Sequence, residues 1–586
     1  MGRYGFGQRV LRTEDPRLLR GEGRFSADIE LPRQAYGYVL RSPHAHAEIH
    51  AIEVARAARA PGVLAVLTAR DADADGLGTF PVVDNLLSRD GGQPFTPRRG
   101  VLAQERARYV GEPVAFVVAE SLDNARDAAE LVEVSFAPLA SVTDTALALS
   151  EGAPTIWPRA PLNLALDWAE GDRAATERAF ARARHVTRLS LVNNRVMAVP
   201  MEPNAALGAY DAGEGRYTLH TPSQGVHVLR EDLARHVLKI PETHLRVVSP
   251  DVGGGFGVRF FALSEHALVL WASRRIGRPV KWVAERAESM LIDCHARDHV
   301  TEAELALDGD GRFLAVRART IANLGAYVSR DGRVVPTKDY AAAIVGAYAI
   351  PAFRVEVKAV FTNTVMTASY RGAGRPEGIY VIERLADLAA VELGLSPVEL
   401  RRRNLVPRAA MPYRSATGEL YDSGDFAKNL VDALALADRD GIEARKAAAR
   451  ARGRRRGLGL STYVKINGGM PDEMAEIRLA KGGEVELLIG SQPNGQGHAT
   501  AYAQLVAERL GVPFEIVRVV QGDSDRVPYG QGTGGSSALS VGGSAVVAAA
   551  ERVIESGRAI ASHLLEAAEP DLAFADGRFT VKGTDR

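Results

Sequence analysis

Two glycine-rich loops contain the residues best suited to bind a ligand through the polypeptide backbone. Residues 253–257 read Gly-Gly-Gly-Phe-Gly, and residues 532–536 read Gly-Thr-Gly-Gly-Ser. Glycine adopts positive φ easily and lets a backbone approach a ligand closely. A loop that runs into a helix also presents several N–H groups at the positive end of that helix. Both loops therefore suit an anionic ligand or one rich in hydrogen-bond acceptors.

A third loop, residues 368–377, places Arg371 and Arg375 among small residues. Guanidinium groups offer fixed hydrogen-bond donors to oxyanions, and the neighbouring glycines leave room for a bulky ligand. The alternative is that both arginines pair with Glu377 or Glu383 in a purely structural network.

The glycine patterns do not match the common nucleotide-binding motifs. Gly253, Gly255 and Gly257 fit the opening of a dinucleotide fingerprint, but the last glycine comes one position early. The required first strand, loop and helix near the N-terminus are also missing. No Gly-Lys-Ser/Thr follows either loop, which excludes a P-loop on motif grounds. A nicotinamide-dependent dehydrogenase is therefore the less favoured alternative.

The two glycine-rich loops belong to two copies of an internal repeat. Each copy begins with Ser-Gln, at 223–224 and at 491–492, and continues through a helical pattern, a Pro and a short apolar strand. The spacing over 241–247 equals that over 513–519. Ordered elements at near-equal spacing indicate two related domains, and we expect two half-sites that face one ligand. A duplication retained only for folding is the alternative.

The elements around the repeat divide the chain into five segments. Strand patterns at 36–40, 63–67 and 113–118 and a helix after the N-cap residue Ser121 predict a small α/β domain. The predicted segments are a tail (1–16), this α/β domain (17–140), a linker (141–165) and the two related domains (166–410 and 411–586).

Composition excludes several classes of protein. The 586 residues carry 72 Lys+Arg and 72 Asp+Glu, and this zero formal charge argues against bulk nucleic-acid binding. A single cysteine, Cys294, allows neither an intramolecular disulfide nor an iron–sulfur cluster held by this chain alone. No uncharged apolar run approaches 18 residues and no signal peptide is recognisable, so we expect a cytoplasmic protein without membrane insertion.

An ordered series of motifs resembles a known family over nearly the whole chain. The motifs lie at 14–19, 41–46, 109–113, 202–204, 253–257, 370–375, 495–498 and 532–536. Their order and spacing are similar to those of the molybdenum-binding large subunits of the xanthine dehydrogenase and aldehyde oxidase family, particularly the carbon monoxide dehydrogenase-like subunits of bacteria. The resemblance implies an α+β multidomain fold, with an N-terminal α/β hammerhead-like domain followed by two related molybdopterin-binding domains.

The resemblance also implies a cofactor and the residues around it. The cofactor is molybdopterin, commonly the cytosine dinucleotide, whose dithiolene holds molybdenum without ligands from protein side chains. The implied catalytic residues are Gln224, Phe256 and Arg371. The implied cofactor-binding residues are Gln224, Gly254, Gly255, Phe256, Arg371, Gly495, Gln496, Gly497, His498, Gly534, Gly535 and Ser536.

The reaction that the resemblance implies is hydroxylation of a small molecule with water as the oxygen source. Electrons then leave through [2Fe-2S] centres to FAD. Since this chain has one cysteine, we expect these centres on an iron–sulfur small subunit and a FAD medium subunit, in a dimer of heterotrimers.

Two departures from the family pattern narrow the substrate. Gly372 stands where carbon monoxide dehydrogenases carry the cysteine that holds copper, so a thiolate-bound copper is not expected. Residues 258–261 read Val-Arg-Phe-Phe, without the glutamate of purine-specific members. An aldehyde or an N-heteroaromatic compound is the predicted substrate.

A third departure concerns the catalytic base. In the family, the base belongs to a Gly-Glu segment well beyond the second glycine-rich loop, and no such segment precedes Arg586. Glu202, Glu265 and Glu377 are interpreted as structural. We therefore expect an incomplete second domain and a chain that is inactive alone. The sequence is a fragment, or a separate polypeptide completes the fold, or the chain is a non-catalytic pterin-binding or assembly scaffold.

Overall fold

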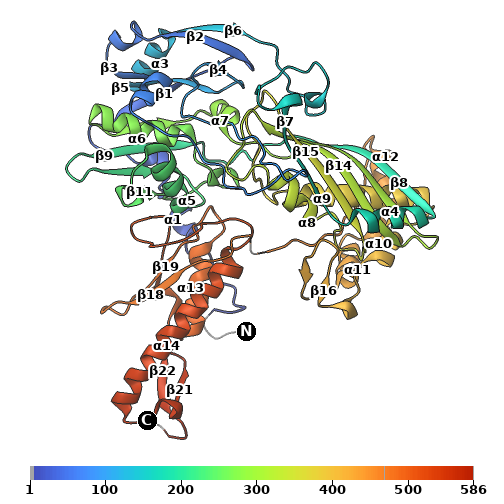
Figure 1. Cartoon of the computed structure of the whole chain (residues 1–586). Coiled ribbons are helices and arrows are strands. Elements are labelled where there is room, and N and C mark those ends of the chain that lie inside the picture. Colours follow the sequence, from blue (N-terminus) through green and yellow to red (C-terminus); the bar gives the residue numbers. More distant parts are fainter. Residues whose placement is uncertain (1–4, 468, 585–586) are drawn as a thin grey trace.

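The computed structural model describes residues 5–467 and 469–584. Figure 1 shows the N-terminal strands beside the first repeat, a second large sheet to one side of them, and the second repeat below, where a long helix leads to the C-terminal hairpin. Residues 5–13 lie against this second repeat: Gly5 N donates to Glu508 (2.8 Å) and Thr13 N donates to Thr500 Oγ1 (2.9 Å). Residues 1–4 of the predicted tail lie outside the described residues.

A seven-stranded sheet joins the N-terminal region to the first repeat, in the order β11-β10-β9-β12-β1-β5-β3. Its strands are β1 (Ala35–Arg41), β3 (Val63–Thr68), β5 (Pro113–Ala119), β9 (Ala205–Asp211), β10 (Arg216–His220), β11 (Leu245–Val248) and β12 (Val280–Val283). Strands β1 and β12 pair in parallel, with Ala35 opposite Val280. The sheet therefore crosses the predicted boundary between the first two domains, which the sequence patterns did not indicate.

The helices of this region follow from local signals. Helix α3 (Leu122–Glu130) begins at the predicted N-cap, where Ser121 Oγ accepts a hydrogen bond from Asn124 N (3.1 Å). Helix α6 (Ser264–Ile276) packs on β9 and β12 and is buried along most of its length. Helix α5 (Val226–Glu231) continues as a π-helical segment to Leu238. A smaller sheet beside them contains β2 (Ala47–Glu53), β4 (Arg106–Ala107) and β6 (Glu133–Pro138).

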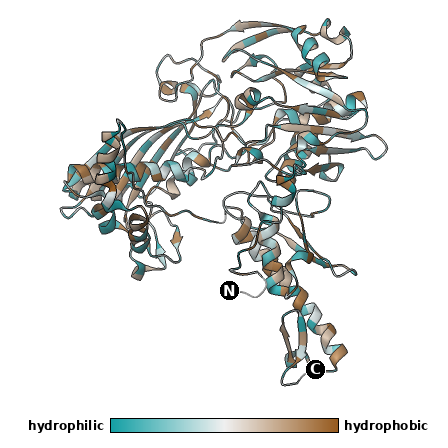
Figure 2. Cartoon of the chain, turned by 180° about the vertical axis from the view of Figure 1, so that it is seen from behind, coloured by the Kyte–Doolittle hydropathy of each residue, from teal (hydrophilic) through white to brown (hydrophobic). Residues whose placement is uncertain are grey.

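A five-stranded sheet, β7-β15-β14-β13-β8, forms the other large body of the molecule. Its strands are β7 (Leu164–Glu170), β8 (His185–Asn193), β13 (His299–Leu307), β14 (Phe313–Gly325) and β15 (Phe353–Phe361). Hydrophobic and hydrophilic residues alternate along these strands (Figure 2), as expected when one face is buried and the other is polar. Helix α9 (Arg375–Glu392) packs on β8 and β13, and α4 (Arg173–Arg182) packs on β14 and β15.

Residues between this sheet and the second repeat pack on the same body. They form α10 (Pro397–Asn404), β16 (Tyr413–Arg414), β17 (Leu420–Tyr421), α11 (Phe426–Leu436) and α12 (Ile442–Ala451). Leu430 of α11 belongs to the core of the five-stranded sheet, and Leu460 packs against that core.

The second repeat has the same order of elements as the first, in a smaller sheet, β18-β19-β20. It comprises β18 (Ala475–Leu479), β19 (Val485–Ile489), α13 (His498–Leu510), β20 (Val517–Val520), α14 (Gly543–Leu565) and the hairpin β21 (Leu572–Ala575) and β22 (Arg578–Val581). In both repeats an antiparallel pair, β9–β10 or β18–β19, precedes a helix and then a parallel strand, β11 or β20. The structure thus confirms the repeat. No helix among the described residues is long and apolar enough to cross a membrane.

Candidate functional site

A cavity of about 650 Å³ lies where the loops of the two repeats meet. Both glycine-rich loops and the arginine-containing loop contribute to its walls. Most of the residues implied for cofactor binding line it, namely Gln224, Gly255, Phe256, Arg371, Gln496, His498, Gly534, Gly535 and Ser536. The two half-sites expected from the repeat therefore face one space.

The other three implied residues belong to the same loops but do not line the cavity. A side chain at Gly254 (φ +105°) would lie 2.8 Å from the Phe256 ring, so this glycine makes room for that ring. Gly495 (φ +103°) and Gly497 (φ +80°) shape the turn before α13, which only glycine adopts easily. Their backbone conformations position the lining residues Gln496 and His498.

The glutamine of the first repeat, Gln224, reaches into the second repeat. Its Nε2 donates to Thr533 O (2.8 Å), and its Oε1 accepts from Gly257 N (2.7 Å). Thr533 N in turn donates to Gln224 O (2.7 Å). One side chain thus ties the two glycine-rich loops together and keeps a second Nε2 hydrogen available to a ligand.

The glutamine of the second repeat, Gln492, reaches back into the first. Its Oε1 accepts from Val226 N (3.2 Å), and its Nε2 donates to Ser223 O. Gln492 is fully buried and lies outside the cavity lining. Gln492 was not among the predicted site residues, although its position as the counterpart of Gln224 in the repeat was a signal for it.

Phe256 and Arg371 form one wall of the cavity. Phe256 has φ +61°, and the residue is 40% exposed. The Arg371 guanidinium carbon lies 5.7 Å from the ring centroid, within cation–π range, and Arg371 N donates to Phe256 O (2.9 Å). Gly257 is required beside this wall, because a side chain there would collide with the Ser369 carbonyl.

The two arginines do not make the ion pairs with Glu377 or Glu383 that the structural alternative required. Glu377 pairs with Arg297 (3.1 Å) and Glu383 pairs with Arg401 (2.9 Å). Arg375 pairs instead with Asp339 (3.1 Å). No described carboxylate lies within ion-pair distance of Arg371, so its charge is available to a ligand in the cavity.

Two aspartates and a lysine line the cavity without having been predicted. Burial raises the pKa of Asp339 to about 6, although the neighbouring Arg375 opposes this shift. Burial also raises the pKa of Asp331, which accepts a hydrogen bond from Ser369 Oγ (3.1 Å). Lys465 Nζ donates to Ser536 Oγ (2.7 Å) and so places a cation at the second glycine-rich loop. These residues lie in segments without a motif that sequence reasoning could use.

Three buried polar atoms at the cavity have no hydrogen-bond partner among the described residues. They are His498 Nδ1, Arg375 Nε and Asp331 Oδ1. Burial lowers the pKa of His498 to about 4, so its imidazole is neutral at pH 7. His498 also begins α13, and Arg375 begins α9, so two helix N-termini border the cavity. The unused Arg375 donor, the two helix ends and Lys465 fit an anionic ligand rich in acceptors.

The three glutamates near motifs lie elsewhere. Glu202 accepts from Gly253 N (2.8 Å), Glu265 pairs with Arg41 (2.7 Å), and Glu377 pairs with Arg297. None of them lines the cavity. They support the loops and helices around it.

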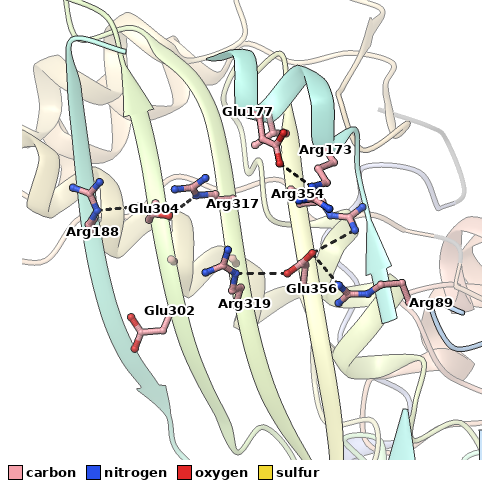
Figure 3. A pocket seen from close by; sticks show the side chains of 13 residues that line it. Arg89, Arg173, Glu177, Arg188, Glu302, Glu304, Arg317, Arg319, Arg354 and Glu356 are labelled. Atoms are coloured by element: carbon pink, nitrogen blue, oxygen red, sulfur yellow. Dashed lines mark hydrogen bonds and ion pairs between the residues drawn. The ribbon is translucent and has the colours of Figure 1, made fainter. Parts of the chain in front are cut away.

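A second hollow of about 500 Å³ lies on the polar face of the five-stranded sheet (Figure 3). Its charged side chains pair with one another, Arg188 and Arg317 with Glu304, and Arg89, Arg319 and Arg354 with Glu356. Neither glycine-rich loop reaches it. We therefore place the functional site at the cavity between the repeats.

Comparison with known domains and proteins gives the family. Residues 20–140 match the a/b hammerhead domain of aldehyde oxidase and xanthine dehydrogenase, and residues 156–405 and 432–586 each match a molybdopterin cofactor-binding domain. The fold and the site together define a protein with one hammerhead domain and two molybdopterin-binding domains, as the motifs implied.

Individual relatives resemble the chain over its whole length. The carbon monoxide dehydrogenase large chain of Hydrogenophaga pseudoflava is 34% identical, with coverage of 99% of this chain and 74% of that protein. Subunit gamma of the 6-hydroxypseudooxynicotine dehydrogenase complex of Paenarthrobacter nicotinovorans is 36% identical, with coverage of 99% and 73%. The crystal structure of quinoline 2-oxidoreductase from Pseudomonas putida 86 matches with a TM-score of 0.91 and 35% identity, covering 98% of this chain and 74% of that chain.

The chain belongs to the xanthine dehydrogenase and aldehyde oxidase family of molybdopterin-binding large subunits. It is a molybdenum-cofactor subunit of an oxidoreductase of the hydroxylase or dehydrogenase type.

Proposed function

We propose that the cavity binds molybdopterin cytosine dinucleotide and that the subunit hydroxylates an aldehyde or an N-heteroaromatic substrate, with water as the oxygen source. The observation that carries this proposal is the meeting of Gln224, Phe256 and Arg371 in one cavity lined by both repeats. The names of two relatives, which refer to 6-hydroxypseudooxynicotine and to quinoline, favour an N-heteroaromatic substrate.

A thiolate-bound copper is not part of this proposal. Gly372 has φ +107°, and a Cβ atom there would collide with the Pro376 ring. A cysteine at this position would therefore need the loop to change, so carbon monoxide is not the proposed substrate despite the likeness to carbon monoxide dehydrogenase.

The chain's own residues bind, orient and donate hydrogen bonds. The glycine-rich loops and His498 hold the cofactor, which supplies the redox chemistry when bound. Gln224, through its free Nε2 hydrogen, and the Arg371 guanidinium line the cavity and would stabilise negative charge on a bound substrate. Phe256 holds Arg371 in place through its ring and its carbonyl oxygen.

Catalysis in this proposal needs further polypeptides. The electrons pass to an iron–sulfur small subunit and a FAD medium subunit in a dimer of heterotrimers, which the single cysteine of this chain supports. Among the described residues no glutamate lines the cavity, and its only carboxylates are Asp331 and Asp339. We therefore propose that this chain alone does not turn over substrate.

Metal and nucleotide analysis tests the cofactor assignment. The chain is produced with molybdenum-cofactor maturation factors and with iron–sulfur and FAD subunits, and the purified protein is assayed for molybdenum and for CMP released by hydrolysis. Near-stoichiometric amounts of both are expected. Molybdenum without CMP would overturn the dinucleotide form. The absence of both molybdenum and CMP would overturn the assignment of the cavity as a cofactor site.

Turnover of aldehydes and N-heterocycles with a dye acceptor tests the reaction. Arg371→Ala should lower kcat by at least about tenfold while the unfolding midpoint stays the same. Arg319→Ala, in the ionic hollow, removes an exposed arginine outside the site and should leave kcat unchanged. Full molybdenum and CMP without turnover of any substrate in the complete complex would indicate a scaffold instead of an enzyme.

A further inference from the structure

One short stretch of the N-terminal region contacts both repeats. Helix α1 (Asp15–Leu19) is short, and Figure 1 shows it between the first repeat and the second. Glu14, just before the helix, bonds to the second repeat, and Arg17 bonds to the first. We call residues 12–17 the bridging segment. They overlap the motif at 14–19, which has no part in the proposed reaction.

Glu14 caps the start of α13, the helix that follows the turn with Gln496. The N-cap residue of α13 is Gly497, which has no side chain to bond the free N–H groups of the first turn. Glu14 takes over this role, because its Oε2 accepts from Thr500 Oγ1 (2.6 Å) and its Oε1 accepts from Thr500 N (3.4 Å). A residue far away in the sequence thus supplies the missing cap.

The bridging segment also packs against the turn itself. Gly497 has φ +80°, and a Cβ atom there would lie 3.2 Å from Arg12 Nε. The turn carries Gln496 and His498, which line the cavity. Its beginning is held by Asn494, whose Nδ2 donates to a carbonyl of the first repeat (3.1 Å). The bridging segment therefore holds the other end of the turn.

Arg17 holds the start of the first glycine-rich loop. It binds Asp251 through two hydrogen bonds, from Nη1 to Oδ2 (2.6 Å) and from Nη2 to Oδ1 (2.7 Å). Bidentate pairs of this kind fix orientation as well as distance. Asp251 also accepts from Arg24 N (2.7 Å), and its own N–H donates to Arg24 O (3.1 Å). Because Asp251 comes two residues before Gly253, the loop begins from a fixed point.

Both carboxylates in these contacts are ionised at neutral pH. Burial raises the pKa of Glu14, but hydrogen bonds, chiefly from Thr500, lower it overall. Burial likewise raises the pKa of Asp251, and the hydrogen bond from Arg17 contributes most to lowering it overall. An ionised carboxylate stabilises a helix N-terminus and makes a stronger hydrogen bond to a guanidinium than a neutral acid does. Both contacts are therefore charge-assisted.

We propose that Glu14 and Arg17 are positioning residues for the cofactor site, which hold the turn at 495–498 and the loop at 253–257 at a fixed separation. The two residues are three positions apart, so they lie on one side of a short helix, within about 5 Å along its axis. Release of either contact lets the two loops move apart and loosens the bound cofactor. The role toward the cofactor rests on the proposed function, whereas the link between the loops rests on the contacts alone.

Amide hydrogen exchange of the complete chain without cofactor tests the link by itself. Arg17→Ala should speed exchange by up to about tenfold in residues 500–503, which lie in the other repeat, as well as in residues 251–257. Arg20→Ala is the matched control, because Arg20 ends the same helix and pairs with Glu22 (2.8 Å). It should change neither region. Faster exchange in residues 251–257 alone would overturn the link.

Release of molybdenum from the assembled complex tests the positioning role. The molybdenum that stays with the protein after gel filtration is followed over time for Arg17→Ala, Glu14→Ala and the double variant. Each single variant should release molybdenum about tenfold faster than the wild type. The double variant should also reach only about tenfold, because a link that is already open at one end loses little more at the other. Release about a hundredfold faster in the double variant would indicate two independent local roles and overturn the proposal.

Conservative variants separate positioning from a general loss of folding. Glu14→Gln keeps an acceptor oxygen for Thr500, and Arg17→Lys keeps the charge, so each should release molybdenum more slowly than its alanine counterpart. Wild-type retention in both alanine variants would overturn the positioning role and leave the proposed function intact. A wild-type complex without molybdenum would instead overturn the proposed function, and the exchange measurement would still decide the link between the loops.

Discussion

The two repeats present almost the same loops from very different surroundings. The first repeat is part of a seven-stranded sheet, and its helix α6 is buried over most of its length. Among the described residues the sheet of the second repeat has three strands, and α14 is buried only at Gly543, Val546, Ala550 and Ala561. Nevertheless Gln224 and Gln492 make reciprocal hydrogen bonds between the two repeats. The strand–helix–strand unit that carries the loops, and not the size of the sheet, determines the geometry of the site.

The largest expected effect contrasts an inner strand of the first sheet with β18, the outer strand of the second among the described residues. Trp282→Ala removes a buried side chain of β12 and should lower the free energy of unfolding by about 3–5 kcal/mol. Leu479→Ala, at an exposed position of β18, should change it by no more than about 0.5 kcal/mol. Urea denaturation followed by circular dichroism measures both. A comparable loss for Leu479→Ala would mean that β18 is covered as well.

The next effect tests the contact between the two glycine-rich loops. Gly532 has φ +85°, and a side chain there would collide with the Gln224 carbonyl of the other repeat. An alanine in the left-handed region costs about 1–2 kcal/mol of unfolding free energy through backbone strain alone. Gly532→Ala should lower the free energy of unfolding by more than this and should also lower the molybdenum content. Gly483→Ala is the matched control, because Gly483 has φ +89° and open space around it. Equal losses of unfolding free energy in Gly532→Ala and Gly483→Ala would show that backbone strain alone matters at Gly532.

The two glutamines should separate stability from catalysis. Gln492→Ala leaves the buried Val226 N–H without its partner and should cost about 1–3 kcal/mol of stability. Gln224→Ala should lower kcat, and the loss of transition-state stabilisation calculated from kcat should exceed the loss of unfolding free energy, because Gln224 lines the cavity. Denaturation curves and dye-linked turnover of both variants give the comparison. Identical profiles for the two variants would contradict the different roles assigned to them.

The smallest effect is a pH dependence that both repeats share. Burial lowers the pKa of His227 and of His498 to about 4 from 6.5. Each histidine binds a proton less readily in the folded protein than in the unfolded chain. The contribution of the neutral histidines to the free energy of unfolding is therefore fully present above pH 6.5 and is lost as the pH falls toward 4. Each histidine should contribute about 1 kcal/mol of loss between pH 6.5 and 5.5.

Asparagine substitutions test this shared pH dependence. Each of His227→Asn and His498→Asn should flatten the acid slope of the unfolding free energy to a similar extent. Only His498→Asn should also reduce cofactor content, because His498 lines the cavity and His227 does not. A reduced cofactor content in both variants would place His227 in the binding site too.

The predictable part of the site comes from local signals. Glycine-rich loops, Ser-Gln pairs and the N-cap at Ser121 depend on residues a few positions apart, so the sequence alone reveals them. Asp331, Asp339 and Lys465 reach the cavity through packing between distant segments, and nothing in their neighbourhoods distinguishes them from ordinary surface residues. The pairing of Ala35 with Val280 likewise joins residues far apart in the chain.

The reciprocal glutamine contacts also set an order of events during biosynthesis. A nascent chain that has emerged as far as β12 already contains Gln224 and the first glycine-rich loop, yet Thr533, which Gln224 bonds, is still to be translated. The walls of the cavity are complete only after Leu539 has been added and the two repeats have docked. A ligand that contacts both walls can therefore be enclosed only after translation has passed Leu539 and both repeats have folded.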